Sequence, residues 1–150
     1  MSNKIPARNL IKFSSGLLPG EIILLWRINF GTFNNRSHFP KYFSQTYGID
    51  APVSLNRMVE DGFVGVDDVY DSLEEFATVD FMRRALRDHR NISGLSKEGR
   101  NGLLDLMEVE FSEKDLESLF EIRGYSLTEK GQEALLEGQE AVDRHPKKKF

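Results

Sequence analysis

The segment "DAPVSLNRMVEDGFVGV", residues 50–66, sets the pattern by which the rest of the chain is interpreted. Asp50 is a favourable N-cap, and apolar residues then recur at three- and four-residue intervals, as on one face of a helix. Gly62 is a stop signal, because glycine tolerates the left-handed conformation that commonly ends helices. The next residues, "FVGV" at 63–66, are mostly apolar and β-branched, which favours an extended conformation. The segment therefore predicts a helix followed by a short strand.

The same alternation of caps, apolar stripes and stops covers most of the chain and predicts a helical protein. The predicted N-caps are Thr78, Ser96, Ser112 and Thr128, and two further helix starts are marked by Pro19 and Pro40. Period-2 alternation is too short for a substantial sheet, although residues 63–66 and 125–127 could pair as a minimal ribbon. We therefore expect a mainly α fold, a bundle of about six to eight short helices with at most a minimal β-ribbon.

Composition narrows the class of protein. The 150-residue chain is long enough for one domain or two small packed subdomains. It contains no cysteine, which excludes disulfides, thiolate zinc sites and a cysteine nucleophile. Its longest apolar run, residues 22–26, is far shorter than the roughly 20 residues that a membrane span needs. These features predict a cytoplasmic protein without a membrane partner.

Charge is segregated along the sequence. Residues 1–50 carry a net charge of +4, residues 51–79 of −6, residues 80–102 of +3 and residues 103–150 of −5. The change of sign near residues 67–78 suggests a boundary there. We expect an N-terminal helical part, residues 1–77, and a C-terminal helical part, residues 78–150, that ends in a helix and a basic tail. The two parts are expected to form one packed unit.

Motifs for catalysis or metal binding are not evident. The carboxylates of "DDVYD", residues 67–71, suit the first turn of a helix better than a cation site. The glycines at 94, 99 and 102 lack the Lys-Ser/Thr ending of a phosphate-binding loop. The three histidines have no ligand or triad partner at a recognised spacing and are expected at the surface: His38, His89 and His145. The protein is therefore predicted to be non-enzymatic, with no metal and no cofactor.

The stretch "TVDFMRRALRDHRNISGLSKEGRNGLLDLM", residues 78–107, resembles a SAP motif, a helix–extended turn–helix module that binds DNA. "RRALRDH" at 83–89 is similar to the first helix of that motif, "ISG" at 92–94 to its turn and "LLDLM" at 103–107 to its second helix. The segment between Gly94 and Leu103 is longer than is usual in the family. Flanking residues are similar to SAP-like regions of Gram-positive bacterial and prophage proteins.

This resemblance implies DNA binding through phosphate contacts. A helix N-terminus offers unpaired N–H groups and partial positive charge, and glycine allows close approach of the backbone. Contacts of this kind position a protein but read few bases, so binding is expected to be weak, salt-sensitive and largely independent of sequence. The residues expected to contact DNA are Arg83, Arg84, Arg87, Arg90, Ser93, Gly94, Lys97 and Arg100.

A second resemblance involves two separate segments. "SLNRMVEDGFV" at 54–64 looks like the recognition-helix end of bacterial winged-helix regulators, and "YSLTEKGQEAL" at 125–135 looks like the start of their post-wing helix. The 65 residues that separate Gly62 from Leu127 exceed the family's spacing, which argues against one intact winged helix and leaves two degenerate winged-helix-like halves as an alternative. The alternatives to a SAP-like DNA-binding protein are therefore a degenerate winged-helix regulator and a helical protein–protein adaptor without DNA affinity.

Overall fold

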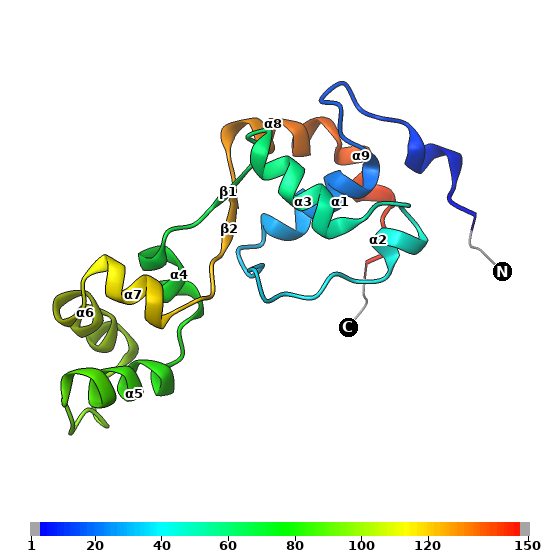
Figure 1. Ribbon diagram of the computed structural model, residues 1–150. Helices are drawn as coiled ribbons and strands as arrows, with labels where there is room; N and C mark the ends of the chain where they lie inside the picture. Colours follow the sequence, from blue (N-terminus) through cyan, green and yellow to red (C-terminus); the bar gives the residue numbers. More distant parts are fainter. Residues whose placement is uncertain (1–3, 148–150) are drawn as a thin grey trace. The chain divides into compact units, whose positions relative to one another are not determined.

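The computed structural model describes residues 4–147 and divides the chain into two compact units (Figure 1). Unit 1 combines residues 1–66 with residues 125–150, and unit 2 is formed by residues 67–124. Unit 2 is thus inserted into the sequence of unit 1, and both ends of the chain belong to unit 1.

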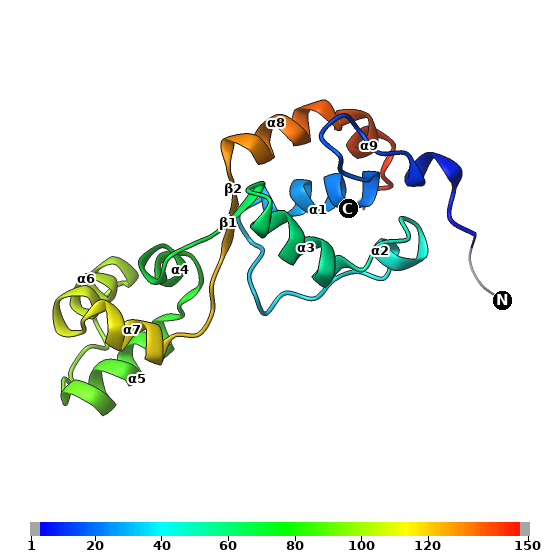
Figure 2. The same ribbon diagram turned by 45° about the horizontal axis from the view of Figure 1, so that its top comes forward.

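Unit 1 is built around the apolar helix α1. Ile22, Leu24 and Leu25 of this helix are fully buried, and α1 contacts α3, α8 and α9, as Figure 2 shows. Two short strands complete the unit. Its elements are the 3₁₀-helix η1 (Ala7–Leu10), α1 (Pro19–Ile28), α2 (Tyr42–Gln45), α3 (Ala51–Glu60), β1 (Val64–Val66), β2 (Tyr125–Leu127), α8 (Glu129–Glu137) and α9 (Gln139–Arg144).

Strands β1 and β2 form the predicted ribbon. They pair antiparallel, with Val64 opposite Leu127 and Val66 opposite Tyr125 (Figure 1). The mainly α fold with a minimal ribbon is therefore confirmed. Residues 4–147 contain nine α-helices, whereas about six to eight were expected. One source of the difference is the helix expected at the C-terminus, which is divided into α8 and α9 at Gly138.

Unit 2 is a four-helix cluster with its own core. Leu73, Met82, Leu86, Leu103 and Met107 are each 1% exposed or less, and α6 contacts both α4 and α5. Its elements are α4 (Val69–Phe76), α5 (Val79–Arg90), α6 (Arg100–Glu110) and α7 (Glu113–Leu119).

The division expected between residues 77 and 78 falls inside unit 2. Leu73 of α4 lies in the same apolar cluster as Met82 of α5, so these neighbouring helices share one core. At the other end, Leu135 and Val142 lie in the core of unit 1. The change of charge near residues 67–78 thus marks the N-terminal end of unit 2. The C-terminal end of unit 2, at Gly124, is not marked by a comparable change of charge in the sequence. Residues 148–150 of the basic tail lie outside the described residues.

Most of the predicted caps are present. Asp50, Thr78, Ser112 and Thr128 each accept a hydrogen bond from the backbone N–H three residues later. The prediction for Ser96 is wrong. A turn in which Glu98 N–H donates to Leu95 O closes first, so α6 begins at Arg100, after an extended Gly99.

Candidate nucleic-acid interface

The SAP-like segment has a helix–turn–helix layout within unit 2. Helix α5 ends at Arg90; its C-cap, Asn91, has a φ of 56°, and Gly94 in the connection has a φ of 75°. Ser93, Gly94 and Lys97 are exposed on this connection. These three residues are therefore accessible, as a contact with phosphate requires.

The arginines of α5 are engaged in contacts within unit 2. Arg84 pairs with Asp80 one turn earlier, and Arg87 Nε lies 3.0 Å from Asp88 Oδ1. Arg83 Nη2 donates to Ser96 O at 3.1 Å and so ties the connection to α5. Exposed pairs of this kind contribute little stability, but each places a carboxylate or carbonyl beside the cation.

Arg90 and Arg100 act as structural cations. The guanidinium of Arg90 donates to Glu110 O at 2.9 Å, pairs with Asp115 at 3.1 Å and lies 4.3 Å from the ring centroid of Phe111. Arg100 donates to the carbonyls of the last turn of α4. Carbonyls at the C-terminal end of a helix carry partial negative charge, so a guanidinium there stabilises the helix end. The carbonyls belong to Leu73, Glu74 and Ala77.

Three of the predicted DNA-contacting cations are therefore held by different parts of unit 2. Arg83 is directed to the α5–α6 connection, Arg90 to the α6–α7 corner and Arg100 to the end of α4. Unit 2 as a whole carries eight Lys/Arg against fifteen Asp/Glu, a net charge of −7. Such a charge opposes binding to a polyanion.

Unit 1 brings together the two segments that resemble parts of a winged helix. Strand β1 follows α3, β2 precedes α8, and the two strands are paired. The side chain of Thr128 caps α8 and lies 2.5 Å from Gly62 O, at the end of α3. Lys130 Nζ donates to Asp61 O at 2.7 Å and lies 4.2 Å from the ring centroid of Phe63. The two segments are thus parts of one unit.

Helices α2 and α3 are joined by a tight connection, residues 46–50. Gly48 has a φ of 67°, a left-handed conformation that suits glycine at a helix end. Tyr47 and Ile49 on either side of it are buried and hold the connection against the core. Two helices joined by a short turn that contains glycine are typical of helix-turn-helix motifs.

Helix α3 buries one face and exposes the other. Ser54, Leu55 and Met58 face the core, whereas Val53 is 57% exposed and Asn56 is also accessible. Beside the exposed face, residues 34–39 form one wall of a pocket of about 150 Å³. The pocket is lined by Asn34, Asn35, Ser37, Phe39, Pro52, Leu55, Asn56 and Tyr125. An accessible helix face with amide groups nearby can donate to and accept from base edges.

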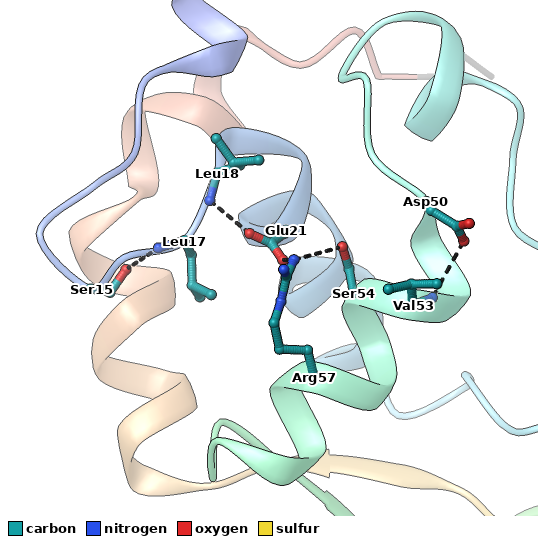
Figure 3. Close-up of polar contacts among 8 residues, drawn as sticks. All are labelled: Ser15, Leu17, Leu18, Glu21, Asp50, Val53, Ser54 and Arg57. Atoms are coloured by element: carbon teal, nitrogen blue, oxygen red, sulfur yellow. Dashed lines mark hydrogen bonds and ion pairs between the residues drawn. The ribbon is translucent and has the colours of Figure 1, made fainter.

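A buried carboxylate fixes α3 on α1 (Figure 3). Glu21 is 2% exposed, accepts a hydrogen bond from Leu18 N–H at 2.9 Å and lies 2.6 Å from Arg57 Nη2. Arg57 also contacts Ser54 Oγ at 3.5 Å. The side chain of Arg57 is 54% exposed, so about half of it remains at the surface of α3.

Unit 1 also differs from unit 2 in charge. It carries twelve Lys/Arg against nine Asp/Glu, a net charge of +3. Lys41, directly before α2, is exposed. A larger groove of about 480 Å³ lies between the start of α3 and the N-terminal segment, and its lining includes Ile5, Phe39, Lys41, Ser44 and Pro52.

One histidine is not where the sequence analysis expected it. His145 is 7% exposed, and its Nδ1 lies 2.5 Å from Tyr47 Oη, whereas His38 and His89 are exposed as expected. Burial, with Lys147 and Arg27 nearby, lowers the pKa of His145. The basic residues that follow His145 gave it the appearance of a surface tail, and the partner Tyr47 is 98 residues away in sequence.

The acidic run at the start of α4 has the predicted role of a helix start. Asp68 accepts a hydrogen bond from Asp71 N–H at 2.8 Å. The neighbouring Asp68 carboxylate, burial, and the Asp67 and Glu74 carboxylates raise the pKa of Asp71. Within residues 4–147, no group of three or more potential ligand side chains is arranged to hold a metal ion.

No protein-family model, curated protein or solved structure matches the chain. Among the described residues, none of the helices combines the length and the apolar character needed to cross a membrane.

Proposed function

We propose that the chain is a non-enzymatic DNA-binding protein whose DNA-contacting part is unit 1, with α2 and α3 as a helix-turn-helix and α3 as the helix that enters the major groove. The observation that supports this best is the pairing of β1 with β2. It joins α3 and α8 into the order of a winged helix, with unit 2 inserted where the wing would be. In helix-turn-helix proteins the first helix crosses the backbone and the second reads base edges.

The distribution of charge supports unit 1 over the SAP-like segment. Non-specific affinity for DNA depends on cations that can replace counterions at the phosphates. Unit 1 has a net charge of +3 and exposes Lys41 beside α2. In unit 2 the net charge is −7 and the arginines of α5 have acceptors within the unit. We therefore propose unit 1 as the source of the affinity.

A fluorescence-anisotropy titration of the full chain with a random-sequence duplex tests this proposal. We expect binding at about 50 mM salt that weakens steeply by about 200 mM. The variant Lys41→Glu with Asn56→Glu places two negative charges on the proposed surface and is expected to abolish binding. Both side chains are exposed, so the fold should be retained.

The matched control carries the same number of acidic substitutions on the SAP-like segment. Arg87→Glu with Lys97→Glu is expected to change affinity much less than the unit 1 variant. If only the unit 2 variant lost binding, the SAP-like segment would be the DNA-binding surface. If the unmodified chain did not bind at low salt, DNA binding would be rejected altogether.

A helical adaptor remains the second candidate because of the acidic surface of unit 2. Burial and the carboxylates of Glu113, Glu108, Asp68 and Glu117, in that order, raise the pKa of Tyr70. Asp68 is the N-cap of α4, Glu108 belongs to α6, and Glu113 and Glu117 belong to α7. An adaptor without DNA affinity is the interpretation that a negative anisotropy titration would favour.

A further inference from the structure

The groove of about 480 Å³ on unit 1 lies where three segments meet: the N-terminal segment, the stretch before α2, and the connection from α2 to α3. The most buried part of its lining is apolar, since Phe43 is 2% and Ile49 is 6% exposed. Ile5 and Phe39 add half-buried apolar surface. A volume of this size with a mostly apolar lining is typical of sites for small organic molecules.

The wall that contains Ile5 is attached to the rest of the unit. A Cβ on Gly48 would lie 3.1 Å from Ile5 Cγ1, so Ile5 packs directly on the connection between α2 and α3. Asn9 Nδ2 donates to Thr46 O at 3.0 Å, and Arg144 Nη2 lies 3.3 Å from Asn9 Oδ1. The N-terminal segment is therefore joined to both the connection and α9. A groove that is already formed in the free protein lowers the cost of binding a ligand.

The charged groups of the lining favour an anionic ligand. The ammonium of Lys41 makes no hydrogen bond or ion pair within residues 4–147. Asp50 also lines the groove, but its Oδ1 accepts a hydrogen bond from Val53 N–H at 3.3 Å and caps α3. A cationic ligand would compete with this cap, whereas an anionic ligand would give Lys41 a partner.

The start of α3 does not offer further donors for a highly charged anion. Pro52 has no N–H, Val53 N–H is used by the Asp50 side chain, and Ser54 N–H donates to Asp50 O at 2.9 Å. Among the described residues that line the groove, Lys41 is the one cation. One fixed positive charge beside an apolar surface matches a single carboxylate on an apolar body better than a phosphate.

We propose that this groove binds a small monocarboxylate with an apolar body, such as a medium-chain fatty acid. The carboxylate pairs with Lys41, and the hydrocarbon chain lies against Ile5, Phe39 and Ile49. Burial of the hydrocarbon supplies most of the affinity, and Lys41 selects the charge of the head group. This proposal does not rest on the proposed function, because it concerns a different ligand and requires no DNA.

The test is an amide chemical-shift titration of the ¹⁵N-labelled full chain with octanoate, octanol and octylammonium at equal ionic strength. These probes share one hydrocarbon chain and differ in the charge of the head group. We expect saturable changes centred on Ile5 and on residues 39–52. Octanoate should bind about threefold more tightly than octanol, the effect of one exposed ion pair, and octylammonium should bind most weakly.

Two substitutions separate the contributions of charge and apolar contact. Lys41→Gln should lower the affinity for octanoate to that for octanol and leave octanol binding unchanged. Ile5→Asn should weaken both ligands by about fivefold, because it removes apolar surface from the wall. The matched controls are Lys12→Gln and Ile11→Asn, which change exposed residues outside the lining and should leave both affinities unchanged.

The proposal would be overturned by octanoate-dependent changes that are absent or spread over both units. Equal affinity for the three probes, or a preference for octanoate that persists in Lys41→Gln, would also overturn it, because Lys41 would then not select the ligand. Dilution of the ligand-free chain tests another occupant. Concentration-dependent changes at residues 39–52 would show that a second copy of the chain covers the groove, which contradicts a ligand site.

Discussion

Gly131, in the first turn of α8, lies directly against the backbone of Phe63. A Cβ at this position would overlap the Phe63 carbonyl oxygen, and the side chain of Leu127 is 3.3 Å away. In the sequence this glycine resembles a weak point of a helix, because glycine is less favourable than alanine there by about 1 kcal/mol. The structure shows that close packing of α8 on the end of α3 requires it.

We therefore expect Gly131→Ala to destabilise unit 1 by about 2 kcal/mol, since the opposing atom belongs to the backbone and cannot move without shifting an element. Gly65→Ala is the matched control, because its Cβ would lie 3.9 Å from the nearest atom, Ser126 O. Denaturant unfolding of both variants checks the difference. Equal stability of the two alanine variants would contradict the close packing seen at Gly131.

His145 predicts a pH dependence of stability. Its pKa in the folded chain is lowered, first by burial and then by the charges of Lys147 and Arg27, so the unfolded chain binds the proton more readily. The contribution of neutral His145 to the free energy of unfolding is therefore complete above the ordinary histidine pKa of about 6.5. It decreases as pH falls through the folded-state pKa. The groups facing His145 are Tyr42, Tyr47, Trp26, Lys147 and Arg27.

Thermal unfolding at about pH 7.5 and about pH 5.5 measures this effect. The melting temperature is expected to fall at the lower pH in the unmodified chain and to fall less in His145→Gln, which cannot titrate. Identical slopes for the two chains would show that His145 is not the responsible group.

At the scale of elements, the placement of α3 on α1 depends on Glu21 and Arg57. Glu21→Gln and Arg57→Met are each expected to cost about 1–2 kcal/mol, at the low end for a buried ion pair because Arg57 is half-exposed. The double variant should cost less than the two single variants together, with a coupling of about 1 kcal/mol. The exposed pair Arg84 with Asp80 is the control, and its coupling should be below about 0.5 kcal/mol.

The elements themselves were largely predictable from local chemistry. Asp50, Thr78, Ser112 and Thr128 mark their helix starts because capping depends on residues only three positions apart. The start of α6 was not predictable in this way, since no side chain caps it and the turn at residues 95–98 decides where it begins.

The Glu21–Arg57 pair and the contact of His145 with Tyr47 were not predictable either. Each joins residues far apart in sequence, and neither leaves a local pattern. In the sequence, the candidate site in unit 1 was indicated only by two separate segments that resemble parts of winged-helix regulators, residues 54–64 and 125–135. The register of β1 on β2 supplied the connection.

At the scale of the whole molecule, the insertion of unit 2 predicts that unit 1 folds without it. Val66 and Tyr125 are paired residues at the end of the ribbon, so an Asn-Gly turn between them should close a hairpin in place of residues 67–124. The shortened chain has a net charge of +3 instead of −4 and is expected to bind duplex DNA more tightly than the full chain at low salt. Circular dichroism and anisotropy check the fold and the affinity, and an unfolded product would contradict the independence of unit 1.

The central claim is that unit 1, and α3 in particular, contacts DNA. Amide chemical-shift mapping of the ¹⁵N-labelled full chain during titration with a random-sequence duplex tests it most directly. The account predicts the largest changes at residues 41–60, in and around α2 and α3, with small changes across α5 and the α5–α6 connection. Changes confined to residues 83–100 would contradict the claim and assign the contact to the SAP-like segment.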